Sequence, residues 1–160
     1  MIHAEMFAAL CALTQREKLD GSYHAAFYLL STDEELFEKA RAHVDKDGID
    51  FARIKSSCRG LDERQRQLLD VAHNLFSWSS RCLVTPYDLS RLGYPTLDYV
   101  CSALYIANGA ISVQIRENDT GVLELALDRS RYEQNRRIYH QFFSPAGWTD
   151  DPEENDMEIG

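Results

Sequence analysis

The sequence predicts a mainly helical α+β fold, a compact bundle of about six helices with one antiparallel β-hairpin late in the chain. Over residues 3–108, apolar side chains recur three and four positions apart, which is the period of an amphipathic helix. Residues that cap or end helices separate these stretches. After residue 110 the apolar period changes to two, the spacing of a strand with one buried face.

The first half of the chain holds three of the expected helices. A helix over residues 3–18 is amphipathic. A second, over 22–30, is apolar on nearly every side, so we expect it to be buried. A third is expected over 33–43, because Thr32 and Glu35 have the spacing of a capping box.

The second half continues with longer helices. The longest is expected over 62–79, starting at a capping box formed by Asp62 and Gln65. Thr85 before Pro86 predicts the start of a short helix, since proline is favoured at the first helical position. The next helix, over 95–108, is expected to turn four side chains inward: Leu97, Val100, Cys101 and Leu104.

Two runs with alternating apolar residues, 111–116 and 123–127, flank a turn-forming sequence at 118–121 and predict a β-hairpin. A two-stranded ribbon is marginal by itself and has open edges. We therefore expect the hairpin to pack on the helices or to form a homodimer through its edge. A last helix follows, up to about residue 143, and its expected apolar side consists of Tyr132, Tyr139, Phe142 and Phe143.

The charge is uneven along the chain of 160 residues. It carries 26 acidic and 17 basic residues, a formal charge of −9, and six of the acids follow residue 145 without any base. We expect one globular domain over 1–144 and an acidic, mostly disordered tail over 145–160. This balance argues against direct nucleic-acid binding by the whole surface. No segment approaches the roughly 20 apolar residues of a membrane span.

Cysteine usage and the N-terminus indicate the compartment. The four cysteines are too few and too widely spaced for the disulfide framework of a small secreted domain. The first six residues lack the basic segment and apolar run of a signal peptide. We therefore expect free thiols and a cytoplasmic protein.

The sequence indicates no catalytic residue, cofactor or metal. Phosphate-binding glycine loops, zinc-protease motifs and nucleophile elbows do not occur in it. The aspartate-rich stretch after residue 43 fails as an EF-hand loop, because His43 would stand first and Lys55 near the far end. One enzymatic alternative stays open, a small thiol enzyme or hydrolase that uses Cys58 or Cys82 with His73.

Three groups of residues are candidates for binding a partner. The first lies in the first 50 residues, which hold ten acids against five bases. The second combines tryptophan, tyrosine and arginine, the side chains that anchor protein interfaces. The third belongs to an arginine-rich last helix, where a solvated, salt-bridged face competes with a phosphate site. The residues are Asp33, Glu34 and Glu38; Trp78, Arg81 and Tyr87; and Arg136 and Arg137.

Several short stretches together resemble a known family. The most specific is Ala-His-Asn-Leu-Phe at 72–76 leading to Thr-Pro-Tyr-Asp-Leu at 85–89, and the others are 26–30, 33–37, 49–51 and 69–71. Over about residues 23–107 the chain resembles an uncharacterised family of small helical proteins from Firmicutes, found on phages and conjugative elements. The resemblance implies an accessory protein of a mobile element, without catalytic residues to carry over.

We therefore expect a non-enzymatic cytoplasmic protein that binds another protein, one with a basic surface. A concrete version is a counter-defence inhibitor, similar to anti-CRISPR proteins, that occludes the basic nucleic-acid groove of a host nuclease. This version requires acidic side chains gathered on one face. A nucleic-acid-binding accessory protein that uses the arginine-rich last helix is a further alternative, which salt-dependent DNA binding would reveal.

Overall fold

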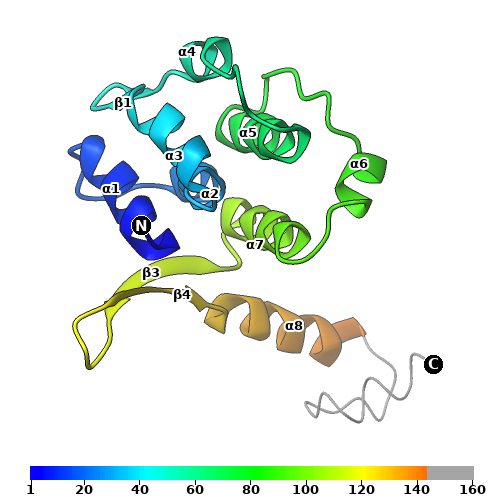
Figure 1. Cartoon of the computed structure of the whole chain (residues 1–160). Coiled ribbons are helices and arrows are strands. Elements are labelled where there is room, and N and C mark those ends of the chain that lie inside the picture. Colours follow the sequence, from blue (N-terminus) through cyan, green and yellow to red (C-terminus); the bar gives the residue numbers. More distant parts are fainter. Residues whose placement is uncertain (144–160) are drawn as a thin grey trace.

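The computed structural model describes residues 1–143, which form eight helices and two antiparallel hairpins (Figure 1). The mainly helical α+β class is confirmed, with more helices than expected and a second, short hairpin. The expected tail over 145–160 lies outside the described residues. The elements are α1 (His3–Leu13), α2 (Gly21–Leu30), α3 (Glu34–Arg41), β1 (Val44–Asp45), β2 (Gly48–Ile49), α4 (Phe51–Ser56), α5 (Glu63–Phe76), α6 (Pro86–Ser90), α7 (Thr96–Asn108), β3 (Ser112–Glu117), β4 (Leu123–Asp128) and α8 (Ser130–Phe143).

Helix α2 is the centre of the fold, and every side chain from Ala25 to Leu30 is buried. It packs mainly against α5 and α7, and also contacts α1 and α3. Gly21 at the start of α2 permits the close approach of α7, because a Cβ atom there would lie 2.8 Å from the carbonyl oxygen of Ile106. The expected burial of this helix is confirmed.

The cap of α3 differs from the expected capping box. Asp33 caps the helix, and its Oδ1 accepts a hydrogen bond from the backbone N–H of Leu36 at 3.0 Å. The hydroxyl of Thr32 instead donates to the carbonyl oxygen of Leu29 at 2.7 Å. The prediction for Thr32 is wrong because its hydroxyl bonds back to the preceding helix, which leaves the aspartate to cap α3.

The caps expected for α5 and α6 are confirmed. Asp62 Oδ1 accepts from the backbone N–H of Gln65 at 2.7 Å, and Gln65 Oε1 accepts from the backbone N–H of Asp62 at 2.8 Å. Thr85 and Asp88 form the same reciprocal pair ahead of α6, with Pro86 at its first position. Both helices thus begin where their sequences predict.

Helix α1 ends at Leu13, five residues earlier than expected. The hydroxyl of Thr14 donates to the carbonyl oxygen of Cys11 at 2.7 Å, and Gln15 has a positive φ of 54°. A hydrogen bond from a side chain to the last turn competes with continuation of the helix, and a residue in the left-handed conformation ends the helix.

Helix α7 is rotated relative to the expectation. Its buried residues are Thr96, Val100, Ala103 and Ile106, whereas Leu104 and Cys101 are exposed. The small side chain of Ala103 faces inward because α7 lies close to α2. The hydrophobic pattern alone favours burial of the larger Leu104. The predicted burial of Leu104 and Cys101 is therefore wrong.

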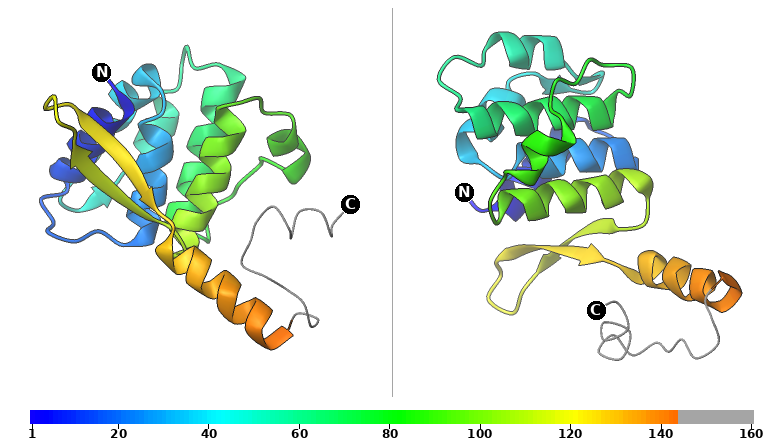
Figure 2. Two further views of the ribbon diagram at one scale, coloured as in Figure 1. Left: turned by 90° about the horizontal axis from the view of Figure 1, so that it is seen from below. Right: turned by 90° about the vertical axis from the view of Figure 1, so that its right-hand side faces the viewer.

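The late hairpin is confirmed. β3 pairs with β4 so that Val113 lies opposite Leu127 and Ile115 opposite Leu125, and β4 packs against α1. The turn is held by Asn118, whose Oδ1 accepts from the backbone N–H groups of Thr120 and Val122. Figure 2 shows that the hairpin leads to α8, which extends away from the helical body.

Candidate protein-interaction surface

The three predicted groups of partner-binding residues lie in three different parts of the molecule. Asp33, Glu34 and Glu38 belong to the cap and the body of α3, and Arg136 and Arg137 belong to α8. Trp78, Arg81 and Tyr87 lie in the connection from α5 to α7. In Figure 1, α3, α6 and α8 are well separated, so the structure does not bring the groups together into one site.

Residues 77–95 form the connection between α5 and α7, which we call the crossover segment. It contains α6, and the right-hand view of Figure 2 shows α6 lying outside α5 and α7. Two side chains of α5 hold its backbone. Asp70 Oδ2 accepts from the backbone N–H of Leu83 at 2.8 Å, and Asn74 Nδ2 donates to the carbonyl oxygen of Ser80 at 3.0 Å.

The crossover segment buries only part of its apolar residues. Val84, Leu89 and Leu92 pack against the core. The side chains that point outward include Trp78 and Tyr94, both 90% exposed, together with Leu83 and Tyr87. Since the backbone is anchored while these side chains are free of the core, the segment presents large apolar groups on an ordered support.

Arginines accompany these exposed side chains. The guanidinium of Arg91 lies 5.7 Å from the ring centre of Tyr87, and its Nη1 donates to the tyrosine hydroxyl at 3.3 Å. Arg81 is exposed in the same segment. We define the crossover surface as Trp78, Arg81, Leu83, Tyr87, Arg91 and Tyr94.

A pocket of about 700 Å³ lies beside this surface, between α4, α5 and the crossover segment. Its lining combines apolar side chains, among them Leu69 and Val84, with four cations. The cations are Lys55 of α4, Arg59 after α4, Arg66 of α5 and Arg81 of the crossover segment. Glu63, Asp70 and Asp88 also line the pocket, so it carries four cations against three acids and is slightly positive, unlike the whole chain.

Two of the acids that line this pocket already have partners. Asp70 forms an ion pair with Lys55 at 3.0 Å, and Asp88 belongs to the cap of α6. Burial acts to raise the pKa of Asp70, but hydrogen bonds from Lys55 and Leu83 outweigh it and lower the pKa. Within residues 1–143, Arg59, Arg66 and Arg81 form no ion pair, so their charges are available to a ligand.

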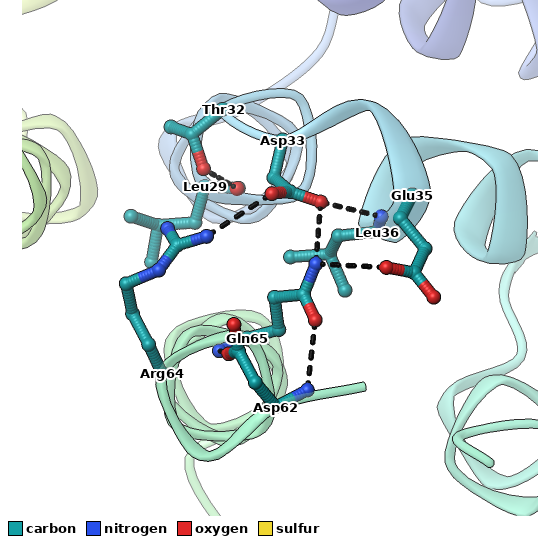
Figure 3. A network of polar contacts seen from close by, with 8 residues as sticks. All are labelled: Leu29, Thr32, Asp33, Glu35, Leu36, Asp62, Arg64 and Gln65. Carbon is teal, nitrogen blue, oxygen red and sulfur yellow. Dashed lines mark hydrogen bonds and ion pairs between the residues drawn. The ribbon is translucent and has the colours of Figure 1, made fainter. Parts of the chain in front are cut away.

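Of the acidic group on α3, Asp33 takes part in an internal network, shown in Figure 3. Asp33 accepts from Arg64 Nη2 at 3.1 Å and from Gln65 Nε2 at 2.8 Å, in addition to its bond with Leu36. Burial acts to raise the pKa of Asp33, and these three donors together lower it. Asp33 therefore joins α3 to α5, and its charge is largely compensated within the chain.

The remaining charged candidates differ in their surroundings. Glu38 Oε2 accepts from Arg41 Nε at 3.1 Å, and Glu34 lies 3.9 Å from the N-terminal amino group. On α8, Arg136 lies 3.8 Å from Glu133, and Arg137 is exposed.

Cys58 and His73, two residues of the alternative thiol enzyme, line different pockets. Cys58 borders the cationic pocket and donates its S–H to the carbonyl oxygen of Ile54, whereas His73 borders a second pocket and stacks on Phe51 at 4.5 Å. Burial raises the pKa of the Cys58 thiol, and likewise that of Cys82. A raised pKa leaves little thiolate at neutral pH, so this arrangement does not favour a thiol nucleophile.

The sequence indicates Trp78, Arg81 and Tyr87 as candidates, but not Leu83, Tyr94 or the pocket. Within the described part of the chain, all four cysteines are free and no cluster of three His, Cys, Asp or Glu side chains could hold a metal ion. None of the described helices combines the length and apolar character needed to cross a membrane. Comparison with protein-family models, with curated proteins and with solved structures gave no match.

Proposed function

We propose that the protein is a non-enzymatic binding protein that holds another protein on the crossover surface. The observation that supports this proposal is the exposure of Trp78, Leu83, Tyr87 and Tyr94 on one anchored segment. Exposed apolar groups of this size mark interaction sites, and tryptophan, tyrosine and arginine supply most of the binding energy at protein interfaces.

The pocket beside the crossover surface indicates the chemistry of the partner. A partner that places a carboxylate between Arg59, Arg66 and Arg81 would gain charge-assisted hydrogen bonds, while its apolar neighbours contact the aromatic side chains. The partner therefore presents an acidic group next to an apolar anchor. The basic partner expected from the net charge would have to contact another surface.

Inhibition of a host nuclease is a more specific form of this proposal, motivated by the resemblance to proteins of mobile elements. In this form, acidic side chains of α3 enter the basic groove of the nuclease. Asp33 and Glu38 already have arginine partners within the chain, and Glu34 lies near the N-terminal amino group. We therefore assign the main contact to the crossover surface and a secondary one to α3.

The test is capture of partners from host lysate by the tagged full-length chain, with and without nuclease treatment, followed by mass spectrometry. We expect a captured protein to be lost when Trp78→Ala and Tyr94→Ala are combined. Each interface anchor contributes about 2 kcal/mol, which corresponds to roughly 30-fold weaker binding. The comparison variant combines Glu34→Gln and Glu38→Gln at the secondary contact and should retain most of the captured partner.

Two other outcomes would contradict the proposal. Loss of the partner from the α3 variant, with retention by the crossover variant, would place the site on the acidic group of α3. Capture that disappears on nuclease treatment and on Arg137→Ala would identify a nucleic-acid-binding protein that acts through α8.

A further inference from the structure

The cationic pocket between α4, α5 and the crossover segment combines two chemistries in one cavity. Its volume of about 700 Å³ is typical of ligand pockets, which span roughly 300–1,000 Å³. Leu69 is buried on α5, Val84 packs against the core, and Leu83 is largely exposed. These apolar side chains line the same cavity as the cations. A ligand that fits this lining therefore carries an anionic group and an apolar group close together.

The charge of the lining favours one kind of anion. Lys55 is paired with Asp70 at 3.0 Å, and Asp88 takes part in the cap of α6. Together with Glu63, the lining has four cations and three acids, a net charge of +1. A carboxylate with one negative charge balances it, whereas a phosphate with about −1.5 to −2 leaves an excess of negative charge. The pocket thus suits a carboxylate.

Three guanidinium groups are available to bind that carboxylate. Arg59, Arg66 and Arg81 are exposed and form no ion pair within residues 1–143. A guanidinium group stays charged and donates two parallel hydrogen bonds to a carboxylate. Because the three arginines come from different parts of the chain, they offer donors from several sides of the cavity.

A carboxylate and an apolar side chain occur on one residue only at the end of a protein chain. In the C-terminal residue, the α-carboxylate and the side chain are attached to the same carbon atom. An internal aspartate or glutamate uses its side chain for the acid, and in an extended chain its neighbours point to the opposite face. An internal segment must also enter and leave the cavity, whereas a chain end only enters it.

The pocket is continuous with the crossover surface, because Arg81 and Leu83 belong to both. A chain whose last residue lies in the pocket therefore leaves it over the crossover surface. Its preceding residues can then contact the exposed aromatic side chains. A free small carboxylate would fill the pocket but leave these side chains uncovered, so the continuity favours a protein as the source of the carboxylate.

We propose that the pocket binds the C-terminal residue of the partner protein. Its α-carboxylate is held by Arg59, Arg66 and Arg81, and its apolar side chain contacts the wall formed by Leu69 and Val84. This inference rests on the proposed function, since the partner is the protein held on the crossover surface. It identifies the acidic group and the apolar group of that partner as parts of one residue.

The test is fluorescence anisotropy of labelled hexapeptides titrated with the full-length chain over roughly 1–500 μM. The probe is Gly-Ser-Gly-Ser-Ala-Leu with fluorescein at its N-terminus and a free C-terminal carboxylate. The same peptide as a C-terminal amide should bind at least about tenfold more weakly, because it loses the charge-assisted hydrogen bonds. A peptide that ends in serine should bind about tenfold more weakly, because it loses the apolar contact.

Substitutions in the pocket should remove the preference for the free carboxylate. We expect the double variant Arg66→Gln and Arg81→Gln to bind the acid and the amide equally weakly. The matched control combines Arg53→Gln and Arg116→Gln, which removes the same charge from exposed arginines outside the pocket lining. This control should keep the preference, and circular dichroism checks that both variants are folded.

Four results would overturn the inference. Equal binding of acid and amide by the wild-type chain would show that no terminal carboxylate is recognised. An amidated peptide with glutamate before the leucine that binds as tightly as the free acid would assign the pocket to an internal acid. Tighter binding of an amidated phosphoserine peptide would assign it to phosphate. N-acetyl-leucine that competes as strongly as the unlabelled hexapeptide would assign it to a free small carboxylate.

The capture experiment separates this inference from the proposed function. A captured partner that is retained by the Arg66→Gln and Arg81→Gln variant, but lost with Trp78→Ala and Tyr94→Ala, would overturn the C-terminal assignment alone. Peptide binding that depends on the carboxylate, without any protein captured on the crossover surface, would contradict the proposed function alone.

Discussion

Helices α2 and α8 are both rich in large apolar residues, yet their environments are opposite. From Ala25 to Leu30, α2 buries every side chain, whereas α8 buries none over 14 residues. The difference follows from the pattern around each helix. α2 is apolar on nearly all sides and can only lie inside the fold, but α8 has one apolar face and needs one neighbour. An amphipathic pattern predicts that a face is covered, without specifying by which chain.

The largest expected difference between the two helices is the change in the free energy of unfolding when one phenylalanine in each is replaced by alanine. Phe27→Ala in α2 should lower the free energy of unfolding by about 3–5 kcal/mol, because it opens a cavity at a fully buried site. Phe142→Ala in α8 should change it by less than about 0.5 kcal/mol, because the side chain is 70% exposed. Urea unfolding of both variants measures the difference. Equal losses would mean that α8 belongs to the core of the single chain.

The contact between α2 and α7 can be tested with glycine substitutions. Gly21→Ala should cost about 1–3 kcal/mol, because the new methyl group would meet the carbonyl oxygen of Ile106 at 2.8 Å, where backbone has to move. Gly93→Ala in the crossover segment is the control, since nothing lies within 4 Å of its added Cβ. Thermal unfolding of the two variants should differ clearly. A neutral Gly21→Ala would contradict the tight packing of α2 against α7.

The network around Asp33 should have a smaller effect. Asp33→Ala removes the cap of α3 and the acceptor of Arg64, and it leaves Gln65 Nε2 only its longer bond to Glu35 at 3.3 Å, so we expect a loss of about 1–2 kcal/mol. Glu34→Ala, at the exposed neighbouring position, should be nearly neutral. If both substitutions are neutral in chemical denaturation, α3 is held by its apolar face alone, and Asp33 is available to a partner.

The smallest expected effect is a dependence of stability on pH. Burial lowers the pKa of His3, His24 and His73 from the ordinary value of 6.5, so the unfolded chain takes up protons first as the pH falls. Stability should therefore decline as the pH drops below 6.5. The pKa of Asp33 and Asp70 is lowered from 3.8, so the stability they provide is present above 3.8 and is lost below it. Urea midpoints that are flat from about pH 7.5 to 5.5 would contradict the histidine contribution.

Sequence reasoning succeeded where a local signal determines the structure. The caps at Asp62 and Thr85 and the turn at 118–121 involve residues within a few positions of one another. It failed at two places where a side-chain hydroxyl bonds back to the preceding turn, the cap expected at Thr32 and the end expected for α1. It also failed where the answer depends on a distant element. The rotation of α7 follows from its packing against α2, and Gly21 gives no local sign that it permits this contact.

The candidate site likewise contains residues that the sequence indicates and a pocket that it does not. Trp78, Arg81 and Tyr87 could be named as candidates because their residue types are typical of interfaces. The cationic pocket could not be found, since its four cations come from α4, the residues after it, α5 and the crossover segment, spread from Lys55 to Arg81. Asp33 was an equally reasonable candidate in the sequence. Only the contacts with Arg64 and Gln65 assign it to the interior network.

The crossover segment also determines how binding specificity can change. Because α5 and α7 are each held by α2, the two ends of residues 77–95 keep their positions whatever chain joins them. Doubling the length of a loop costs only about 0.6 kcal/mol in closure entropy. The sequence of this segment can thus be exchanged without changing the helices on either side. A different sequence between the same two helices could recognise a different protein, while the core that supports it remains unaltered.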